Sequence, residues 1–354
     1  MAIDRDLLHA LLTAAGPTGF EGRPARVFAD AARGFADAVE VDAYGSVYAT
    51  VRAGARPHVL IAGHVDEIGL LVTHVDDEGF LYVTGLGGWD PLQLIGQRVT
   101  IMGRGGDVLG VVGRKPAHLL DEADKTKPVK LTDLWIDVGA RDRADAQRHV
   151  AAGDAAVIAQ PVVELLNGRL VSKALDDRIG AYVALEVARR SRGPAGVTAV
   201  ATVQEEIGGI GARVAAVRAR PDVAVAVDVT HAIDTPGLEK KQHGETGLGK
   251  GADLSVGSYA HRGLLERLRT LAEANGIPVT LGFTPRGTGT DADHLAYARG
   301  GVPTAVVSVP NRYMHSPNEM VDLADVAHVI DLLVAFVDGL DPDDLVALSA
   351  LPAG

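Results

Sequence analysis

The chain has 354 residues, of which 47% are hydrophobic and 23% are charged, a composition typical of a soluble globular protein with one large domain or two. It contains no cysteine, which excludes disulfides, zinc–thiolate sites and thiol catalysis, so any metal site must use histidine and carboxylate ligands. The net charge of −12 argues against nucleic acid as a partner. Because the sequence shows no signal segment and no apolar run of transmembrane length, we expect a cytoplasmic protein without a membrane partner.

The first 67 residues are predicted to begin an α/β domain. Two amphipathic helices are expected, one over residues 4–15 and one from about Pro24, followed by short strands at 39–41 and 47–51. The apolar run at 58–62 is typical of a strand buried on both faces. His64 and Asp66 follow it directly, which places both at the end of a core strand.

Between about residues 68 and 165 the pattern changes to short strands separated by turns, as in a small antiparallel barrel or sandwich. Strands are predicted at 70–75, 81–84, 99–102, 108–112, 134–138 and 155–158, with a polar surface loop over 115–130. We interpret 68–165 as an inserted β-domain. Residues 1–67 and 166–354 would then form the domain that carries the functional site.

From residue 169 alternating strands and helices return. Strands are predicted at 169–172, 197–203, 223–227, 277–283 and 304–309, and helices at 177–190, 208–219, 264–274, 293–298 and 323–336, with a loop rich in glycine and lysine before residue 264. Such alternation with near-continuous apolar strands predicts an α/β fold in which helices cover both faces of a mostly parallel sheet.

Ionisable side chains stand at the ends of several predicted strands. The candidates are His64, Asp66, Asp176, Asp177, Glu205, Glu206, Asp228 and His315. Each pattern alone has an ordinary explanation, such as a helix N-cap for an Asp-Asp pair or a structural histidine at a strand end. Because ligands of open α/β sheets bind beyond the carboxyl ends of the strands, five such strand ends together favour one polar site.

Charge indicates what this site would hold. The carboxylates of Asp176, Glu206 and Asp228 would repel one another at one buried position, and two divalent cations would balance them. Two histidines and three carboxylates suit Zn²⁺ or Co²⁺ better than Mg²⁺ or Ca²⁺. Asp66 has the spacing of a carboxylate that orients the imidazole of His64. Six ionisable residues in or near the motifs, including Asp177, are expected to be structural or to face substrate rather than to bind metal: Glu67, Asp177, His231, His243, Asp291 and His294.

A set of motifs occurs along the chain in a fixed order: GHVDEIG (63–69), KALDDRIG (173–180), VQEEIGGIGA (203–212), AVDVTHAIDTPG (226–237), LGKG (248–251), GTDAD (289–293) and RYMHSP (312–317). Together they resemble the TET or glutamyl-aminopeptidase group of M42 metallo-aminopeptidases over nearly the whole chain. The chain departs from many relatives at Gly209-Ile210, where they carry Leu-Arg, and at Val65, where methionine is commoner.

The resemblance implies a role for each matching residue. His64 and Asp228 would each help to hold a metal ion, with Asp176 bridging two ions. Glu206 and His315 would complete the ligand set, Glu205 would be the general acid/base, and Asp66 would orient His64. The resemblance also implies a homododecamer built from dimers, with contacts made by the inserted domain.

The predicted reaction is the removal of N-terminal residues from peptides with a free N-terminus. A water molecule activated by two cations would attack the scissile carbonyl while Glu205 takes its proton, and nearby carboxylates would grip the α-amine. The preferred N-terminal residue stays open between acidic, aliphatic and basic. A cationic group could line a site for acidic residues or form a solvated loop: Lys240, Lys241, His243 and Lys250.

Three alternatives remain at this stage. A metal-dependent deacylase of small N-acyl substrates would accept blocked N-termini. A glycoside hydrolase would use a carboxylate pair without metal and would resist chelators. A non-catalytic scaffold would be inert toward peptides with both metals bound.

Overall fold

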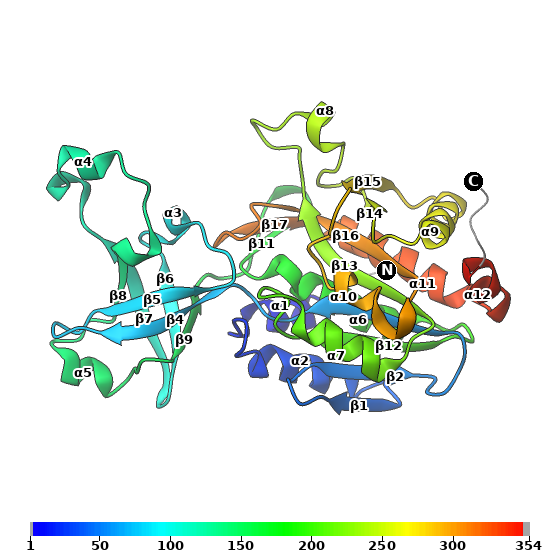
Figure 1. Cartoon of the computed structure of the whole chain (residues 1–354), viewed down its shortest axis with the longest axis horizontal. Helices are drawn as coiled ribbons and strands as arrows, with labels where there is room; N and C mark the ends of the chain where they lie inside the picture. Colours follow the sequence, from blue (N-terminus) through cyan, green and yellow to red (C-terminus); the bar gives the residue numbers. More distant parts are fainter. Residues whose placement is uncertain (1–2, 350–354) are drawn as a thin grey trace.

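The computed structural model describes residues 3–349, which form two lobes (Figure 1). The larger lobe contains an open sheet. Its strand order is β1 (Ala38–Val41), β2 (Val47–Val51), β12 (Gly196–Thr202), β3 (His58–His64), β13 (Val223–His231), β16 (Thr304–Arg312), β17 (Glu319–Asp322), β11 (Arg169–Ser172) and β10 (Val163–Glu164). Two further strands, β14 (Ala252–Gly257) and β15 (Val279–Thr284), join it through β16.

The centre of this sheet is parallel. β12, β3, β13 and β16 pair in parallel, whereas the strands on either side of them pair antiparallel. The predicted mostly parallel sheet is therefore confirmed for the core. Because parallel strands end at one edge, residues that follow β12, β3 and β16 meet there.

Helices cover both faces, as predicted. One face carries α1 (Arg5–Thr13), α2 (Gly22–Ala32), α6 (Leu175–Arg190), α9 (Arg262–Ala274) and α11 (Leu323–Asp338), and the other carries α7 (Ile210–Ala219) and α10 (Ala292–Leu295). Successive side chains of β3 point alternately toward the two faces of the sheet. Val59 and Ile61 belong to the larger hydrophobic core with α6, whereas Leu60 and Ala62 belong to the core with α7.

The smaller lobe is a closed antiparallel barrel. Its strand order is β4 (Gly69–Val75), β5 (Leu81–Leu86), β8 (Leu134–Asp137), β7 (Gly106–Arg114), β6 (Arg98–Gly103) and β9 (Ala155–Ile158). The chain enters through β4 and leaves through β9, and these two strands pair with Leu71 opposite Ala155. Short helices lie in its connections: α3 (Pro91–Leu94), α4 (Glu122–Lys125) and α5 (Arg143–Gln147).

Some elements differ from the expectations. β14 and the short helix α8 (Lys240–His243) lie in the segment interpreted as a loop, and β17 precedes the last predicted helix without having been predicted. A further helix, α12 (Pro342–Ser349), ends the described chain. The strand predicted at 277–283 begins at Val279, after Pro278, which has no backbone N–H to donate to a strand partner.

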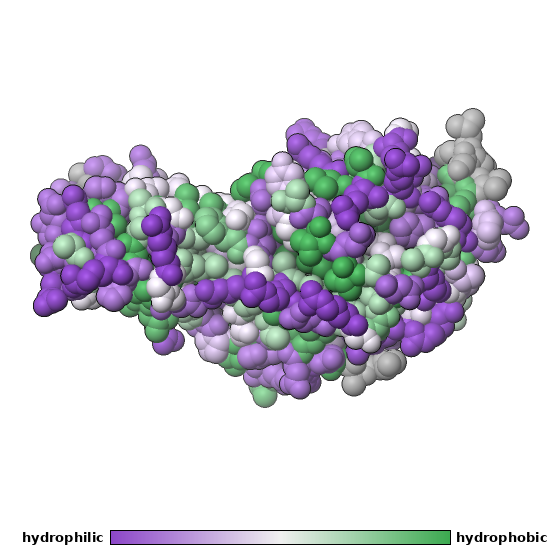
Figure 2. Space-filling view, turned by 90° about the horizontal axis from the view of Figure 1, so that it is seen from below, coloured by the Kyte–Doolittle hydropathy of each residue, from purple (hydrophilic) through white to green (hydrophobic). Residues whose placement is uncertain are grey.

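The two lobes lie side by side, with the barrel at the left of both views (Figure 2). Arg23 of α2 and Asp107 of β7 join them through two parallel hydrogen bonds of 2.7 and 2.6 Å. Within residues 3–349, no helix combines the length and the apolar character that crossing a membrane requires.

Candidate metal centre

The residues at the strand ends come together at the carboxyl edge of the parallel core. His64 Nε2 lies 3.1 Å from Asp176 Oδ1, and His315 Nε2 lies 3.3 Å from Asp176 Oδ2. His315 Nε2 is also 3.3 Å from Glu206 Oε1. Asp176, at the start of α6, thus turns one carboxylate oxygen toward each of two imidazoles, one at the end of β3 and one in the turn between β16 and β17.

Asp66 faces His64 on the side away from Asp176. The Nδ1 atom of His64 is 3.2 Å from the backbone oxygen of Asp66 and 3.4 Å from its carboxylate. The same carboxylate accepts the backbone N–H groups of Glu205 and Glu206 at 3.1 and 3.2 Å. Asp66 is completely buried. It therefore connects the histidine to the loop that carries the two glutamates.

Close packing of α6 brings Asp176 to this position. A Cβ atom on Gly63 would lie 2.2 Å from the backbone nitrogen of Ala181, and one on Gly180 would lie 2.5 Å from the carbonyl oxygen of Val227. Glycine at both positions lets the start of α6 lie directly against β3 and β13. The φ and ψ angles of Asp176 and Asp177 are not helical, so the regular helix begins after the Asp-Asp pair.

Burial and mutual repulsion determine the acidity of the cluster. Burial, followed by the charges of Asp177 and Asp176, raises the pKa of Asp228 well above its usual range. Burial also raises the pKa of Glu205 to about 8, although the charge of His64 opposes this shift. A buried cluster with so many carboxylates is short of positive charge, which divalent cations would supply.

The pKa values of the two histidines are raised as well, here because neighbouring carboxylates stabilise the charged imidazolium. Hydrogen bonds to Asp176 and Glu206 raise the pKa of His315 to about 11. Although burial acts against it, the carboxylates of Asp176 and Asp66 raise the pKa of His64 above its usual range. Burial acts to raise the pKa of Asp176 too, but the imidazoles of His315 and His64 hold it below the usual range.

The donor set fits metal ions. Ligand atoms of His64, Asp176 and Glu206 lie within 4.8 Å of one another, and so do those of His64, Asp177 and Asp228. The second group contains Asp177, where the family resemblance implies Asp176. We favour Asp176 as the ligand, because the two carboxylate oxygens of Asp177 already accept backbone N–H groups, from His64 at 3.1 Å and from Gly180 at 3.0 Å. Mixed nitrogen and oxygen donors suit Zn²⁺ or Co²⁺.

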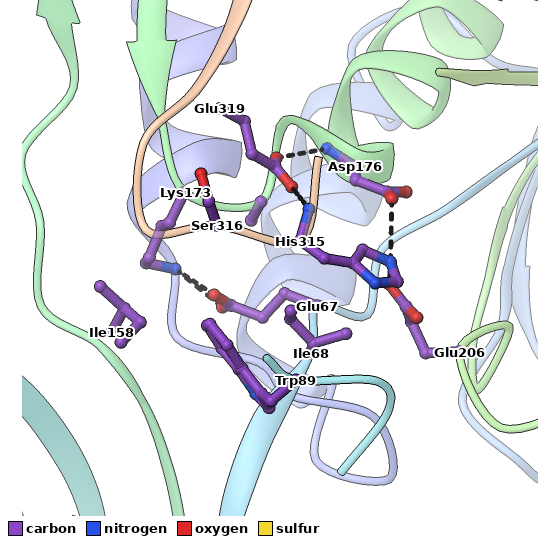
Figure 3. Close-up of a pocket in the computed structure, with 11 residues that line it drawn as sticks. Glu67, Ile68, Trp89, Ile158, Lys173, Asp176, Glu206, His315, Ser316 and Glu319 are labelled. Atoms are coloured by element: carbon purple, nitrogen blue, oxygen red, sulfur yellow. Dashed lines mark hydrogen bonds and ion pairs between the residues drawn. The ribbon is translucent and has the colours of Figure 1, made fainter. Parts of the chain in front are cut away.

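The barrel lobe forms one wall of the site. A small pocket beside Asp176, Glu206 and His315 is also lined by Trp89, which follows β5 (Figure 3). A Cβ atom on Gly87 would lie 3.4 Å from the Glu206 carboxylate, and one on Gly88 would lie 3.7 Å from His315 Nδ1. The barrel loop at residues 87–89 therefore reaches the candidate metal ligands.

Some of the residues expected to be structural or to face substrate are buried in polar contacts, and others are exposed on the surface. Glu67 is buried and pairs with Lys173 at 2.7 Å and Arg178 at 2.9 Å, which is a structural role. Asp291 accepts a hydrogen bond from the hydroxyl of Thr202 at 2.5 Å. The ring of His294 packs against Gly209. His231 is exposed, and so are Lys240, Lys241 and His243 on α8, which projects from the larger lobe (Figure 1). Lys250 is half-buried, and its Nζ donates to the backbone oxygen of Glu245 at 2.9 Å.

Two buried glutamates in contact with the site were missed by the sequence analysis. Glu21 accepts the backbone N–H of Gln204 at 3.1 Å, and Glu319 accepts those of Asp176 and His315, both at 2.9 Å. Glu319 follows His315 by four residues, which is a weak sequence signal. Its contact with Asp176 spans 143 residues, and that of Glu21 with Gln204 spans 183, so neither could be inferred from local pattern.

The chain is similar in sequence and in fold to known aminopeptidases. Residues 45–332 match the M42 glutamyl aminopeptidase family. A lysyl aminopeptidase of Pyrococcus furiosus is 37% identical over 97% of this chain and 99% of that protein. The crystal structure of a TET aminopeptidase from the marine sediment archaeon Thaumarchaeota archaeon SCGC AB-539-E09 matches with a TM-score of 0.93 and 35% identity, covering 98% of each chain. The Pyrococcus horikoshii TET1 peptidase, which can assemble into a tetrahedron or a large octahedral shell, matches with a TM-score of 0.83 and 31% identity, covering 95% of this chain and 99% of that one.

Proposed function

This chain belongs to the M42 glutamyl aminopeptidase family and is a metal-dependent aminopeptidase, and we propose that five of its residues hold two divalent cations: His64, Asp176, Glu206, Asp228 and His315. The observation that carries this proposal is the placement of the two Asp176 oxygens, 3.1 Å from one imidazole and 3.3 Å from the other. One carboxylate facing two histidines in this way suits a bridging ligand. Such cations polarise the scissile carbonyl and acidify water when they are bound.

Glu205 is proposed as the general acid/base. Its carboxylate lies 3.9 Å from His64 Nε2, and its side chain is 15% exposed, so it is next to the cluster and still reachable by substrate. Burial raises its pKa to about 8 in the metal-free protein, and cations bound beside it would lower that value toward the range in which a carboxylate takes and returns a proton near neutral pH. We propose that Glu205 removes a proton from the attacking water and delivers one to the leaving amine.

Replacing Glu205 tests this role. Glu205→Gln keeps the size of the side chain and removes the proton acceptor, so we expect both metals to stay bound and kcat to fall by about 10²-fold or more. Metal content and thermal unfolding of the variant, measured beside the parent protein, are the controls. Full activity in a variant that binds metal normally would remove Glu205 from this role.

Metal identity and substrate class can be tested together. Metal-stripped protein is restored with Zn²⁺ or Co²⁺ and assayed on a panel of acidic, aliphatic and basic aminoacyl substrates. We expect chelation to abolish turnover and either ion to restore it. N-acetylated peptides should not be cleaved, because the site must bind a free α-amine. Turnover of acetylated substrates would favour the deacylase, and glycoside hydrolysis that resists chelators would favour the carboxylate-pair chemistry of glycosidases.

We propose that residues 68–165 form a separate domain that mediates assembly into a dodecamer built from dimers. Two observations support this. The related Pyrococcus horikoshii TET1 peptidase can assemble into a tetrahedron or a large octahedral shell. In this chain, the barrel exposes large apolar side chains on one strand, with Leu109 68% and Val111 46% exposed on β7.

A further inference from the structure

Glu319 is a buried carboxylate that accepts hydrogen bonds from the backbones of two proposed ligands, Asp176 and His315 (Figure 3). Only 3% of the residue is exposed. Its Oε2 accepts the backbone N–H of Asp176 at 2.9 Å, and its Oε1 accepts that of His315, also at 2.9 Å. Each oxygen therefore has one backbone partner, and the two partners belong to different parts of the fold.

The two segments that Glu319 joins need external support. His315 has a φ of +59°, in the left-handed region that is unfavourable for residues other than glycine. Asp176 lies in the non-helical start of α6, after Ala174 with a φ of +57°. The side chains of Asp176 and His315 nevertheless meet at 3.3 Å. Glu319 itself is fixed by the pairing of β17 with β11, where it lies opposite Ser172.

Two of the other proposed ligands are held by different carboxylates. The backbone N–H of His64 is accepted by Asp177 at 3.1 Å, and that of Glu206 is accepted by Asp66 at 3.2 Å. The loss of Glu319 would therefore release His315 and the backbone of Asp176 while the supports of His64 and Glu206 remain.

We propose that Glu319 is a positioning residue that sets the affinity of one metal subsite, formed by Asp176, Glu206 and His315, and has a smaller effect on the subsite of His64 and Asp228, which shares only the bridging Asp176 with it. This inference rests on the proposed two-metal function. Groups that orient metal ligands commonly change metal affinity by about 10- to 100-fold when they are replaced, without touching the ion themselves.

The test is a calorimetric titration of the metal-free full-length protein with Zn²⁺. Glu319→Gln preserves the side-chain shape but turns an amide NH₂ toward one of the two backbone N–H groups. We expect the parent to bind two ions, and the variant to bind one of them about 10- to 100-fold more weakly and the other with a much smaller loss of affinity. Excess metal should restore most of the lost turnover. The absorption spectrum of the Co²⁺-loaded variant provides a second readout, with the bands of one ion lost at limiting metal.

Asp325→Asn is the matched control. Asp325 is also buried, and its two oxygens each accept one backbone N–H, from Gly249 and Gly251 at 2.7 Å, neither of which is a proposed ligand. It should lose stability but bind both ions like the parent. Unchanged affinities in Glu319→Gln, or equal weakening of both ions, would overturn the inference.

A second variant covers the case in which Glu319→Gln does not fold. Glu319→Asp keeps the charge but is one methylene shorter, so its carboxylate cannot reach both N–H groups in this geometry. It should show the same selective weakening, and two unweakened ions there would count against the role of Glu319. A parent protein that binds fewer than two ions would instead contradict the two-metal function.

Discussion

Individual carboxylates hold the turn that presents Glu205. Three consecutive backbone N–H groups are accepted by two buried side chains, that of Gln204 by Glu21 and those of Glu205 and Glu206 by Asp66. Gln204 has a φ of +57°, so this turn is unfavourable without such partners. The position of the proposed acid/base thus depends on two residues from the first 66 of the chain.

Glu21 gives a pH-dependent prediction for the metal-free protein. Burial, and then the charge of Asp66, raises the pKa of Glu21 from its ordinary value of 4.5 to about 7. Between these values the folded state holds a proton that the unfolded state has released, so the free energy of unfolding falls as pH rises from about 4.5 to 7. Glu21→Gln cannot ionise. From pH 5 to pH 8, its stability relative to the parent should therefore rise by roughly 1–3 kcal/mol.

Urea unfolding of both metal-free proteins across this pH range measures the difference. Comparing the two pH values cancels any fixed cost of the amide group. Parallel curves for Glu21→Gln and the parent would mean that Glu21 is already ionised in the folded protein at pH 5.

At the scale of elements, the contact between β3 and α6 sets the distance from His64 to Asp176. Gly63 precedes His64, and its missing side chain lets α6 approach. Gly63→Ala should destabilise the protein by about 1–3 kcal/mol or more, because the added methyl would overlap the helix backbone. It should also weaken metal binding by displacing His64.

Gly22→Ala in α2 is the control for this change. A Cβ atom at Gly22 would meet no heavy atom within 4 Å. Alanine also suits a helix better than glycine, so the stability should stay the same or rise by up to about 1 kcal/mol. Unfolding curves and metal titrations of both variants measure these effects. Equal stability and equal metal affinity in Gly63→Ala and Gly22→Ala would show that the β3–α6 contact does not constrain the site.

The same elements explain how far sequence alone could predict the structure. β3 and β13 were predicted because strands buried on both faces are continuous apolar runs. β14 was missed because it buries Asp253, whose carboxylate accepts hydrogen bonds from Thr246 at 2.6 Å and Thr280 at 2.9 Å. Local pattern cannot show that a distant residue will satisfy a buried charge.

The candidate metal centre was likewise predictable only where local sequence pattern carries the signal. The proposed ligands could be inferred because they stand at or near the predicted ends of strands that share one edge of the sheet, and because their motifs resemble those of one family. Glu21 and Glu319 could not, since each acts through a backbone N–H group that only the folded chain brings near.

For the whole molecule, the barrel and the larger lobe share one site. Gly87 and Gly88 of the barrel lie against Glu206 and His315, and the ion pair of Arg23 with Asp107 joins the lobes at a second position. Contacts that fix the barrel within an assembly would therefore also fix one wall of the candidate metal centre. Assembly and catalysis are expected to be coupled.

The outer face of β7 is where the proposed assembly can be tested. Leu109→Asp combined with Val111→Asp places two charges on it, and burying them between subunits without partners would cost several kcal/mol. We expect the double variant not to form the proposed dodecamer, measured by light scattering after size exclusion, while metal content is retained. Val217→Asp, at a residue 64% exposed on α7, is the matched control and should assemble normally. Because isolated exposed apolar residues are common on monomers, a double variant that still assembles fully would place the subunit contacts elsewhere on the molecule.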